Sequence, residues 1–126
     1  MPLVRIDLQK GTSPEYRATL GQVVYESLLS IGVPQNDRFQ IITEKTPEEL
    51  LFDRSYLGIN RSDALVIIQI TLNEGRTTEV KKRLYKAIAE GLQARLACRP
   101  EDVFISLVEV KPENWSFGNG EAQYAK

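Results

Sequence analysis

The sequence predicts an α+β fold in which duplicated β-α-β units form one four-stranded mixed sheet with two helices on one face. Three observations support this prediction. Apolar residues are grouped in short strand-like segments, helix-start signals follow the first and third of these segments, and the second half of the chain repeats the pattern of the first. A chain of 126 residues is long enough to form one domain with its own core, without disulfides or metals.

The first unit covers residues 2–45. Residues 3–8 alternate between apolar and polar side chains, which is typical of a strand with one buried face. Ser13 and Pro14 then supply a capping residue and a proline at the first helical position, and apolar residues follow at helical spacing. A Gly-Val-Pro sequence ends this helix, and residues 39–43 predict a second strand.

The second unit covers residues 64–110. Residues 64–72 are rich in β-branched side chains and predict a central strand. Residues 75–79 open a second helix, which carries apolar residues at helical spacing, and residues 103–110 predict a fourth strand. Mixed signals between residues 45 and 61 predict a long connection between the units.

An internal duplication relates the two units. Gly11 and Glu15 recur as Gly75 and Glu79 at an offset of 64, and residues 37–47 match residues 102–112 at an offset of 65. Each unit requires a right-handed crossover between parallel strands. We expect one domain over residues 1–126, with a C-terminal arm at residues 111–126. One sheet face would lack helices, so oligomerisation is expected to cover it.

Composition excludes several classes of function. The net charge of −1 gives no electrostatic basis for binding nucleic acid or an anionic membrane. The chain contains no histidine, which excludes Ser-His-Asp and Cys-His catalysis and zinc sites with histidine ligands. No apolar segment has the length of a membrane-spanning helix. The single cysteine, Cys98, suits a buried core position and a reducing cytoplasm, so we predict a cytoplasmic protein.

Pro2 directly precedes the first strand and has two interpretations. It is either an incidental residue after the initiator Met1, or the new amino terminus after Met1 is removed. In the second case it becomes a secondary amine held on a strand, and an ordinary α-amino group has a pKa of about 7.7–8.0, close to neutrality. Burial would lower the pKa and favour a general base, whereas a neighbouring carboxylate would raise it and favour an acid.

Several further motifs, together with Pro2, resemble the tautomerase superfamily (4-oxalocrotonate tautomerase-like proteins with an amino-terminal proline). Within it, the chain is most similar to the malonate semialdehyde decarboxylase group. The motifs are Gly-Val-Pro with Asp-Arg at 32–38, Leu-Gly and Arg-Ser at 57–62, Arg76, Val-Glu at 108–109, and Trp-Ser-Phe-Gly at 115–118. The resemblance extends from Pro2 to about Tyr124. It implies a homotrimer and an enzyme that needs no cofactor and no metal.

The resemblance also implies roles for individual residues. Pro2 would be the catalytic acid or base, and Asp37 its charged neighbour. Arg76 would be catalytic and would bind the substrate carboxylate, which arginine can hold through two parallel hydrogen bonds. The apolar wall of the substrate site would consist of the aromatic residues Trp115, Phe117 and Tyr124.

Simpler interpretations remain open for the same residues. Asp37 is equally suited to capping a turn, Arg76 to a solvated loop, and Trp115 and Phe117 to packing at a subunit interface. Glu74 is a departure from the resemblance, because the decarboxylases have a second arginine two residues before the one that matches Arg76. This difference weighs against decarboxylation of malonate semialdehyde itself and leaves a site with one arginine.

Three functions are therefore compared. The first is a lyase similar to malonate semialdehyde decarboxylase, which acts on a small oxo acid with Pro2 as the acid. The second is an isomerase, a keto–enol tautomerase acting on phenylpyruvate or a dienol acid with Pro2 as the base. The third is a non-catalytic oligomeric binding protein that keeps the fold.

Overall fold

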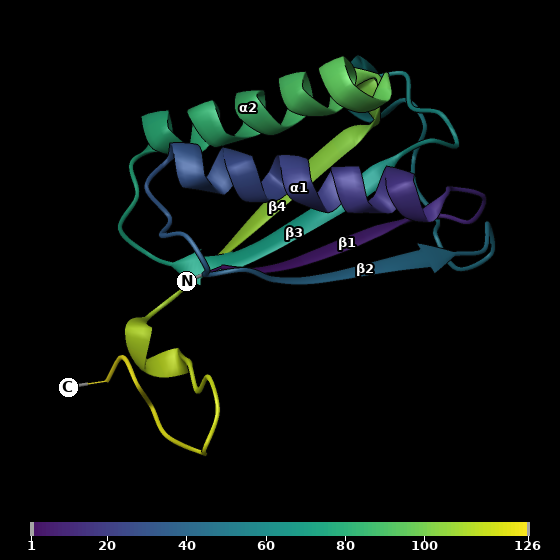
Figure 1. Cartoon of the computed structure of the whole chain (residues 1–126). Coiled ribbons are helices and arrows are strands. Elements are labelled where there is room, and N and C mark those ends of the chain that lie inside the picture. The colour runs from purple at the N-terminus through teal and green to yellow at the C-terminus, as the bar shows by residue number, and fades with distance from the viewer. Residues whose placement is uncertain (1, 126) are drawn as a thin grey trace.

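The computed structural model describes residues 2–125 and consists of one four-stranded sheet with both helices on the same face (Figure 1). The strand order is β2-β1-β3-β4, and the sheet is mixed, as predicted. The helices and strands are β1 (Leu3–Gln9), α1 (Pro14–Ser30), β2 (Phe39–Lys45), β3 (Val66–Asn73), α2 (Thr78–Leu96) and β4 (Val103–Val110). Short 3-10 turns lie at Tyr56–Gly58, Pro100–Asp102 and Pro112–Asn114.

The strand directions bring four chain segments to one end of the sheet. β1 and β2 are parallel, β3 and β4 are parallel, and the two pairs join through the antiparallel ladder between β1 and β3. In this ladder Leu3 is opposite Thr71, and on the other side Leu3 is opposite Phe39. The starts of β1 and β2 therefore lie beside the ends of β3 and β4, where Asn73 pairs with Val110. We call this edge the Pro2 end.

The third strand begins two residues later than predicted, at Val66 instead of Ala64. A turn occupies the preceding residues, because the Leu65 amide donates to the Ser62 carbonyl at 3.2 Å and the Ala64 amide donates to the Ser62 hydroxyl at 3.1 Å. Asp102, which is fully buried, accepts hydrogen bonds from the Ser62 amide at 2.7 Å and from its hydroxyl at 2.6 Å. These bonds fix the turn and delay the start of the strand.

The helices begin at capping residues that satisfy free backbone amides. The Ser13 hydroxyl accepts from the Tyr16 amide at 3.0 Å, and the Thr77 hydroxyl accepts from the Val80 amide at 3.3 Å. Arg76 thus lies directly before the cap of α2. The helices pack closely at Gly91, where an added Cβ would lie 2.7 Å from a methyl of Val23.

The core lies between the helices and one face of the sheet. It is formed by alternate residues of the central strands and by one side of each helix, as the alternation predicts. Its largest fully buried side chains are Ile6, Leu20, Leu28, Leu65, Ile68, Ile70, Leu72, Leu84, Ile88 and Leu92. Cys98 is also buried in this core, as expected for a small apolar residue. Among the described residues, no helix is long and apolar enough to cross a membrane.

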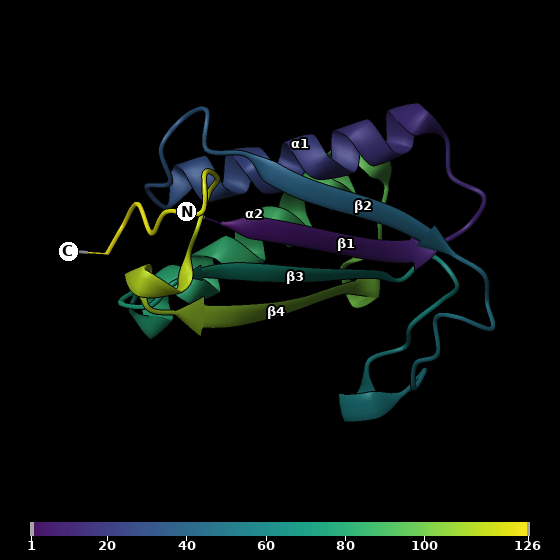
Figure 2. The ribbon, with the colours of Figure 1, turned by 90° about the horizontal axis from the view of Figure 1, so that it is seen from below.

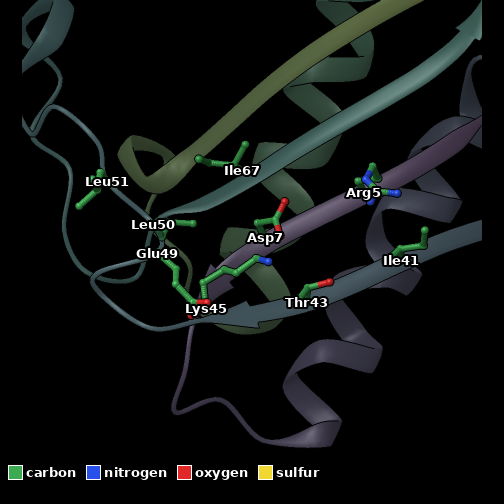
Figure 3. A pocket seen from close by; sticks show the side chains of 9 residues that line it. All are labelled: Arg5, Asp7, Ile41, Thr43, Lys45, Glu49, Leu50, Leu51 and Ile67. Atoms are coloured by element: carbon green, nitrogen blue, oxygen red, sulfur yellow. The ribbon is translucent and has the colours of Figure 1, made fainter.

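Among residues 2–125, no helix covers the opposite face of the sheet, as predicted (Figure 2). Exposed apolar side chains on the strands include Phe39, Ile41, Phe104 and Val108. A hollow of about 340 Å³ also lies on this face, with residues from β1, β2, β3 and the segment after β2 (Figure 3). Its lining residues are Arg5, Asp7, Ile41, Thr43, Lys45, Glu49, Leu50, Leu51 and Ile67.

Glu44 ties the connection between β1 and α1 to the end of β2. One of its carboxylate oxygens accepts from the Thr12 hydroxyl at 2.6 Å, from the Thr12 amide at 2.9 Å and from the Gly11 amide at 3.2 Å. The same oxygen lies 3.1 Å from Arg17. The hydrogen bonds from Thr12, above all, lower the pKa of Glu44 below its ordinary value.

Replacing Glu44 by glutamine is expected to lower the melting temperature at neutral pH. A carboxylate with a lowered folded-state pKa stabilises the fold above its ordinary pKa of 4.5, and this contribution is lost as the pH falls through the folded-state value. The difference in melting temperature between the wild type and E44Q should therefore shrink on acidification below about pH 4.5, as measured by circular dichroism.

The matched control is E48Q, because Glu48 is exposed four residues along the same segment. It should melt with the wild type at every pH. A difference between the wild type and E44Q that stayed constant with pH would contradict the assigned role of the Glu44 carboxylate.

Candidate functional site

A cavity of about 220 Å³ lies at the Pro2 end of the sheet. Pro2 itself is buried and forms part of its wall. The start of β1, the start of β2 and the C-terminal arm meet here, and Figure 2 shows the arm running across the strand ends beside the N-terminus. The lining residues are Pro2, Leu3, Phe39, Trp115, Ser116 and Phe117.

Three aromatic side chains of the arm pack in series. The rings of Trp115 and Phe117 are stacked, with centroids 5.4 Å apart and planes inclined by 18°. The ring of Tyr124 meets Phe117 edge-on, with centroids 4.9 Å apart. Trp115 and Phe117 line the cavity, whereas Tyr124 contacts Phe117, does not line the cavity and is 41% exposed. We call these three residues the aromatic wall.

A reversal of the chain allows Tyr124 to meet Phe117. Residues 118–120 all have positive φ angles, of 143°, 61° and 67°, and glycine occupies two of the three positions. Gln123 closes the resulting loop: its side-chain oxygen accepts from the Phe117 amide at 2.9 Å, and its side-chain nitrogen donates to the Gly118 carbonyl at 2.8 Å. The aromatic wall is therefore a folded unit.

Arg76 lies in the turn between β3 and α2. Gly75 adopts a φ angle of 120°, which allows the chain to fold back, and the Arg76 guanidinium donates to the Asn73 carbonyl at 3.1 Å. Among residues 2–125, Arg76 forms no ion pair, and this bond uses only one of its five N–H donors. The half-buried guanidinium thus keeps donors for a carboxylate.

Asp37 is partly buried and lies two residues before Phe39, the first residue of β2. One of its carboxylate oxygens is shielded from solvent. It belongs to the same edge of the sheet as Pro2 but does not line the cavity. The predicted removal of Met1 concerns a residue outside those that the structure describes.

Glu74, the departure noted in the sequence, is exposed at the Pro2 end. Its amide donates to the Val110 carbonyl at 2.9 Å, so its backbone continues the β3–β4 pairing. Its side chain forms no hydrogen bond or ion pair with residues 2–125. This chain therefore has a carboxylate two residues before Arg76. A second arginine at that position would have added to the attraction for an anionic substrate.

Three residues of this region were given no site role from the sequence, although Ser116 belongs to the Trp-Ser-Phe-Gly motif. Phe39 and Ser116 line the cavity, and Asn73 contacts both Arg76 and Trp115. A usable signal existed for Phe39, because the first residues of parallel neighbouring strands lie together.

Cys98 lies far from the candidate site. Helix α2 starts at the Pro2 end of the sheet, and Cys98 follows the other end of this helix (Figure 1). Burial raises the pKa of its thiol.

The arrangement suits acid–base chemistry on a small carboxylic acid. An apolar wall lies beside Pro2, and a cation with free donors lies at the same edge of the sheet. Among residues 2–125, no group of three or more carboxylates, thiols or imidazoles is arranged to hold a metal ion.

Comparisons with known proteins agree with this geometry. A family model described as "Tautomerase enzyme" matches residues 37–118, and a second model with the same description matches residues 2–60. "Probable tautomerase YusQ" of Bacillus subtilis (strain 168) is 43% identical over 124 residues, which is 98% of each chain.

Two solved structures are also similar. The FG41 malonate semialdehyde decarboxylase inhibited by 3-bromopropiolate is 41% identical, with a TM-score of 0.89 over 97% of this chain and 93% of that chain. A second malonate semialdehyde decarboxylase is 31% identical, with a TM-score of 0.90 over 97% of this chain and 95% of that one. The resemblance found in the sequence is thus confirmed. This chain belongs to the tautomerase superfamily of enzymes.

Proposed function

We propose that this enzyme decarboxylates a small 3-oxo acid, as malonate semialdehyde decarboxylase does, with Pro2 as the catalytic acid and without a cofactor or metal. The observation that carries the proposal is the cavity in which Pro2 faces the aromatic residues Trp115 and Phe117, with Arg76 at the same edge. The 41% identity to a malonate semialdehyde decarboxylase supports this choice of substrate class.

In the proposed reaction, Arg76 binds the substrate carboxylate and the cationic Pro2 amine donates a hydrogen bond to the 3-oxo group. Asp37 is the charged neighbour that favours the cation. The bond between C1 and C2 breaks, its electron pair forms the enolate, and carbon dioxide leaves. The enolate then takes a proton at C2 from the Pro2 ammonium group and becomes the aldehyde, and the Pro2 amine regains a proton from solvent. Arg76 contributes by holding the breaking bond perpendicular to the carbonyl plane.

The alternative is a keto–enol tautomerase in which neutral Pro2 abstracts a proton from a 2-oxo acid such as phenylpyruvate or from a dienol acid. Two observations favour it. Pro2 is buried against apolar residues, which disfavours its cationic form, and Glu74 stands in place of a second arginine. Here Trp115 and Phe117 would pack against the hydrocarbon part of the substrate, and Tyr124 would hold Phe117 through their edge-on contact.

We also propose a homotrimer, in which other copies of this chain cover the open sheet face. The tautomerase-type resemblance supports the trimer, and the exposed Ile41 and Phe104 on this face supply an apolar surface. The cytoplasmic location predicted from the sequence belongs to the same proposal and suits the buried thiol of Cys98.

Replacing Pro2 by alanine is expected to lower kcat for carbon dioxide release from malonate semialdehyde about 100-fold, since acid–base groups typically contribute at least that much. Alanine retains an amine but lacks the ring that fixes its direction. The matched control is Pro14→Ala, at the first position of α1, which should retain the wild-type rate. A P2A variant as active as the wild type would contradict the proposal that Pro2 is the catalytic acid.

The pH dependence of kcat/KM distinguishes the two enzyme functions. If Pro2 acts as the acid, the decarboxylation rate falls as the pH rises through the pKa of its amine. If Pro2 acts as the base, tautomerisation of phenylpyruvate rises over the same interval. Phenylpyruvate turnover that rises with pH, with no carbon dioxide release from malonate semialdehyde, would replace the first function by the second.

The trimer is expected to show a mass three times the chain mass of 14.3 kDa in light scattering. Ile41→Asp, on the open face, should shift the mass towards that of one chain. Tyr85→Asp is the control, because Tyr85 is an exposed apolar residue on α2, and it should leave the mass unchanged. A wild-type mass of one chain at micromolar concentration would refute the trimer.

A further inference from the structure

Asn73, the last residue of β3, accepts hydrogen bonds from two residues of the proposed substrate site. Its side-chain oxygen accepts from the Trp115 indole N–H at 2.7 Å, and its backbone carbonyl accepts from the Arg76 guanidinium at 3.1 Å. The proposed function places the substrate carboxylate on Arg76 and the remainder of the substrate against Trp115. One residue therefore contacts both halves of the site.

The hydrogen bond between Trp115 and Asn73 connects the C-terminal arm to the sheet. Among residues 2–125, it is the only hydrogen bond between residues 111–125 and the remainder of the chain. The arm's other hydrogen bonds are internal, such as those of Gln123 with Phe117 and Gly118. The position of the aromatic wall relative to the sheet therefore depends on Asn73 and on apolar packing around Pro2.

Asn73 is well suited to hold Trp115 in place, because its own backbone is held by strand pairing. Its backbone lies in the β3–β4 ladder opposite Val110, at the end of a strand that pairs with a neighbour on each side. The bond to Trp115 is partly buried, where hydrogen bonds are less weakened by solvent. The indole N–H is the only polar group of the Trp115 side chain, so no other side-chain bond can replace it.

We propose that Asn73 is a positioning residue that sets the distance between the carboxylate-binding Arg76 and the aromatic wall. The site then selects carboxylic acids whose apolar group lies at one particular distance from the carboxylate. This inference rests on the proposed substrate site. In it, carboxylate binding and wall contact are coupled through Asn73, and removing its side-chain oxygen uncouples them.

The test measures binding without turnover, by NMR titration of two acids, 3-phenylpropionate and propionate. Asn73→Ala keeps the backbone bond to Arg76 and removes the bond to Trp115. The expected result is a dissociation constant for 3-phenylpropionate raised about five- to tenfold, with a change below twofold for propionate. Equal changes for the two acids would overturn the proposal, as would a wild type that binds neither acid.

A double-mutant cycle separates positioning from general structural damage. Trp115→Phe keeps an aromatic ring and lacks the N–H donor. If the hydrogen bond carries the effect, adding N73A to W115F should change the affinity for 3-phenylpropionate less than twofold. Fully additive effects of the two substitutions would overturn the proposal.

Two further variants keep the test valid if N73A folds poorly. Asn73→Asp retains an acceptor for the indole N–H, and it should keep the emission maximum of Trp115, the only tryptophan in the chain, whereas N73A shifts it to the red. Asn114→Ala, next to Trp115 in the arm, is the matched control and should bind both acids like the wild type. An N73D emission spectrum like that of N73A would contradict the proposal.

These experiments test the role of Asn73 independently of the proposed enzymatic activity. A wild type that binds 3-phenylpropionate, shows the coupling and turns over no oxo acid would keep the role of Asn73 and refute the enzymatic assignment. An active wild type with additive variants would refute the role of Asn73 alone.

Discussion

The antiparallel pairing of β1 with β3 is the constraint on which the rest of the structure depends. Each β-α-β unit alone brings together only the like ends of its two parallel strands. The antiparallel ladder reverses one unit against the other, so that Pro2 at the start of β1 lies at the same edge as the end of β3. The turn carrying Arg76 and the arm carrying Trp115 both leave from that edge. Without this pairing Pro2 and Arg76 would lie at opposite ends of the sheet.

Two opposing physical effects meet at this edge. The apolar surroundings of Pro2 disfavour a cationic amine, whereas a carboxylate such as that of Asp37 favours one. The proposed decarboxylase requires the second effect to dominate, and the tautomerase requires the first. Arg76 would bind the substrate in either proposed reaction, because both proposed substrates carry a carboxylate. The two proposed reactions thus differ mainly in the protonation state of one nitrogen.

Local signals in the sequence predicted most of the fold, and they failed where contacts are long-range. The Ser13 cap acts within one helical turn, so its residue type sufficed to predict it, and the start of the second helix was likewise predicted within residues 75–79. The start of β3 was misplaced because the Ser62 amide donates a hydrogen bond to Asp102, 40 residues away, which holds Ser62 in a turn. The contact of Asn73 with Trp115 spans 42 residues and follows no periodic pattern. Pro2 and the aromatic residues were identified through the family resemblance and not from their spacing.

The central claim is that Pro2 carries a free amine that takes part in the reaction, and ¹⁵N NMR of proline-labelled protein tests it most directly. The chain has six prolines, and only a proline at the amino terminus has a nitrogen that gains and loses a proton. We predict that one proline nitrogen titrates and that its pKa coincides with the pKa seen in kcat/KM. If none of the six titrates, or if the titration and the pH profile disagree, Pro2 is not the catalytic group.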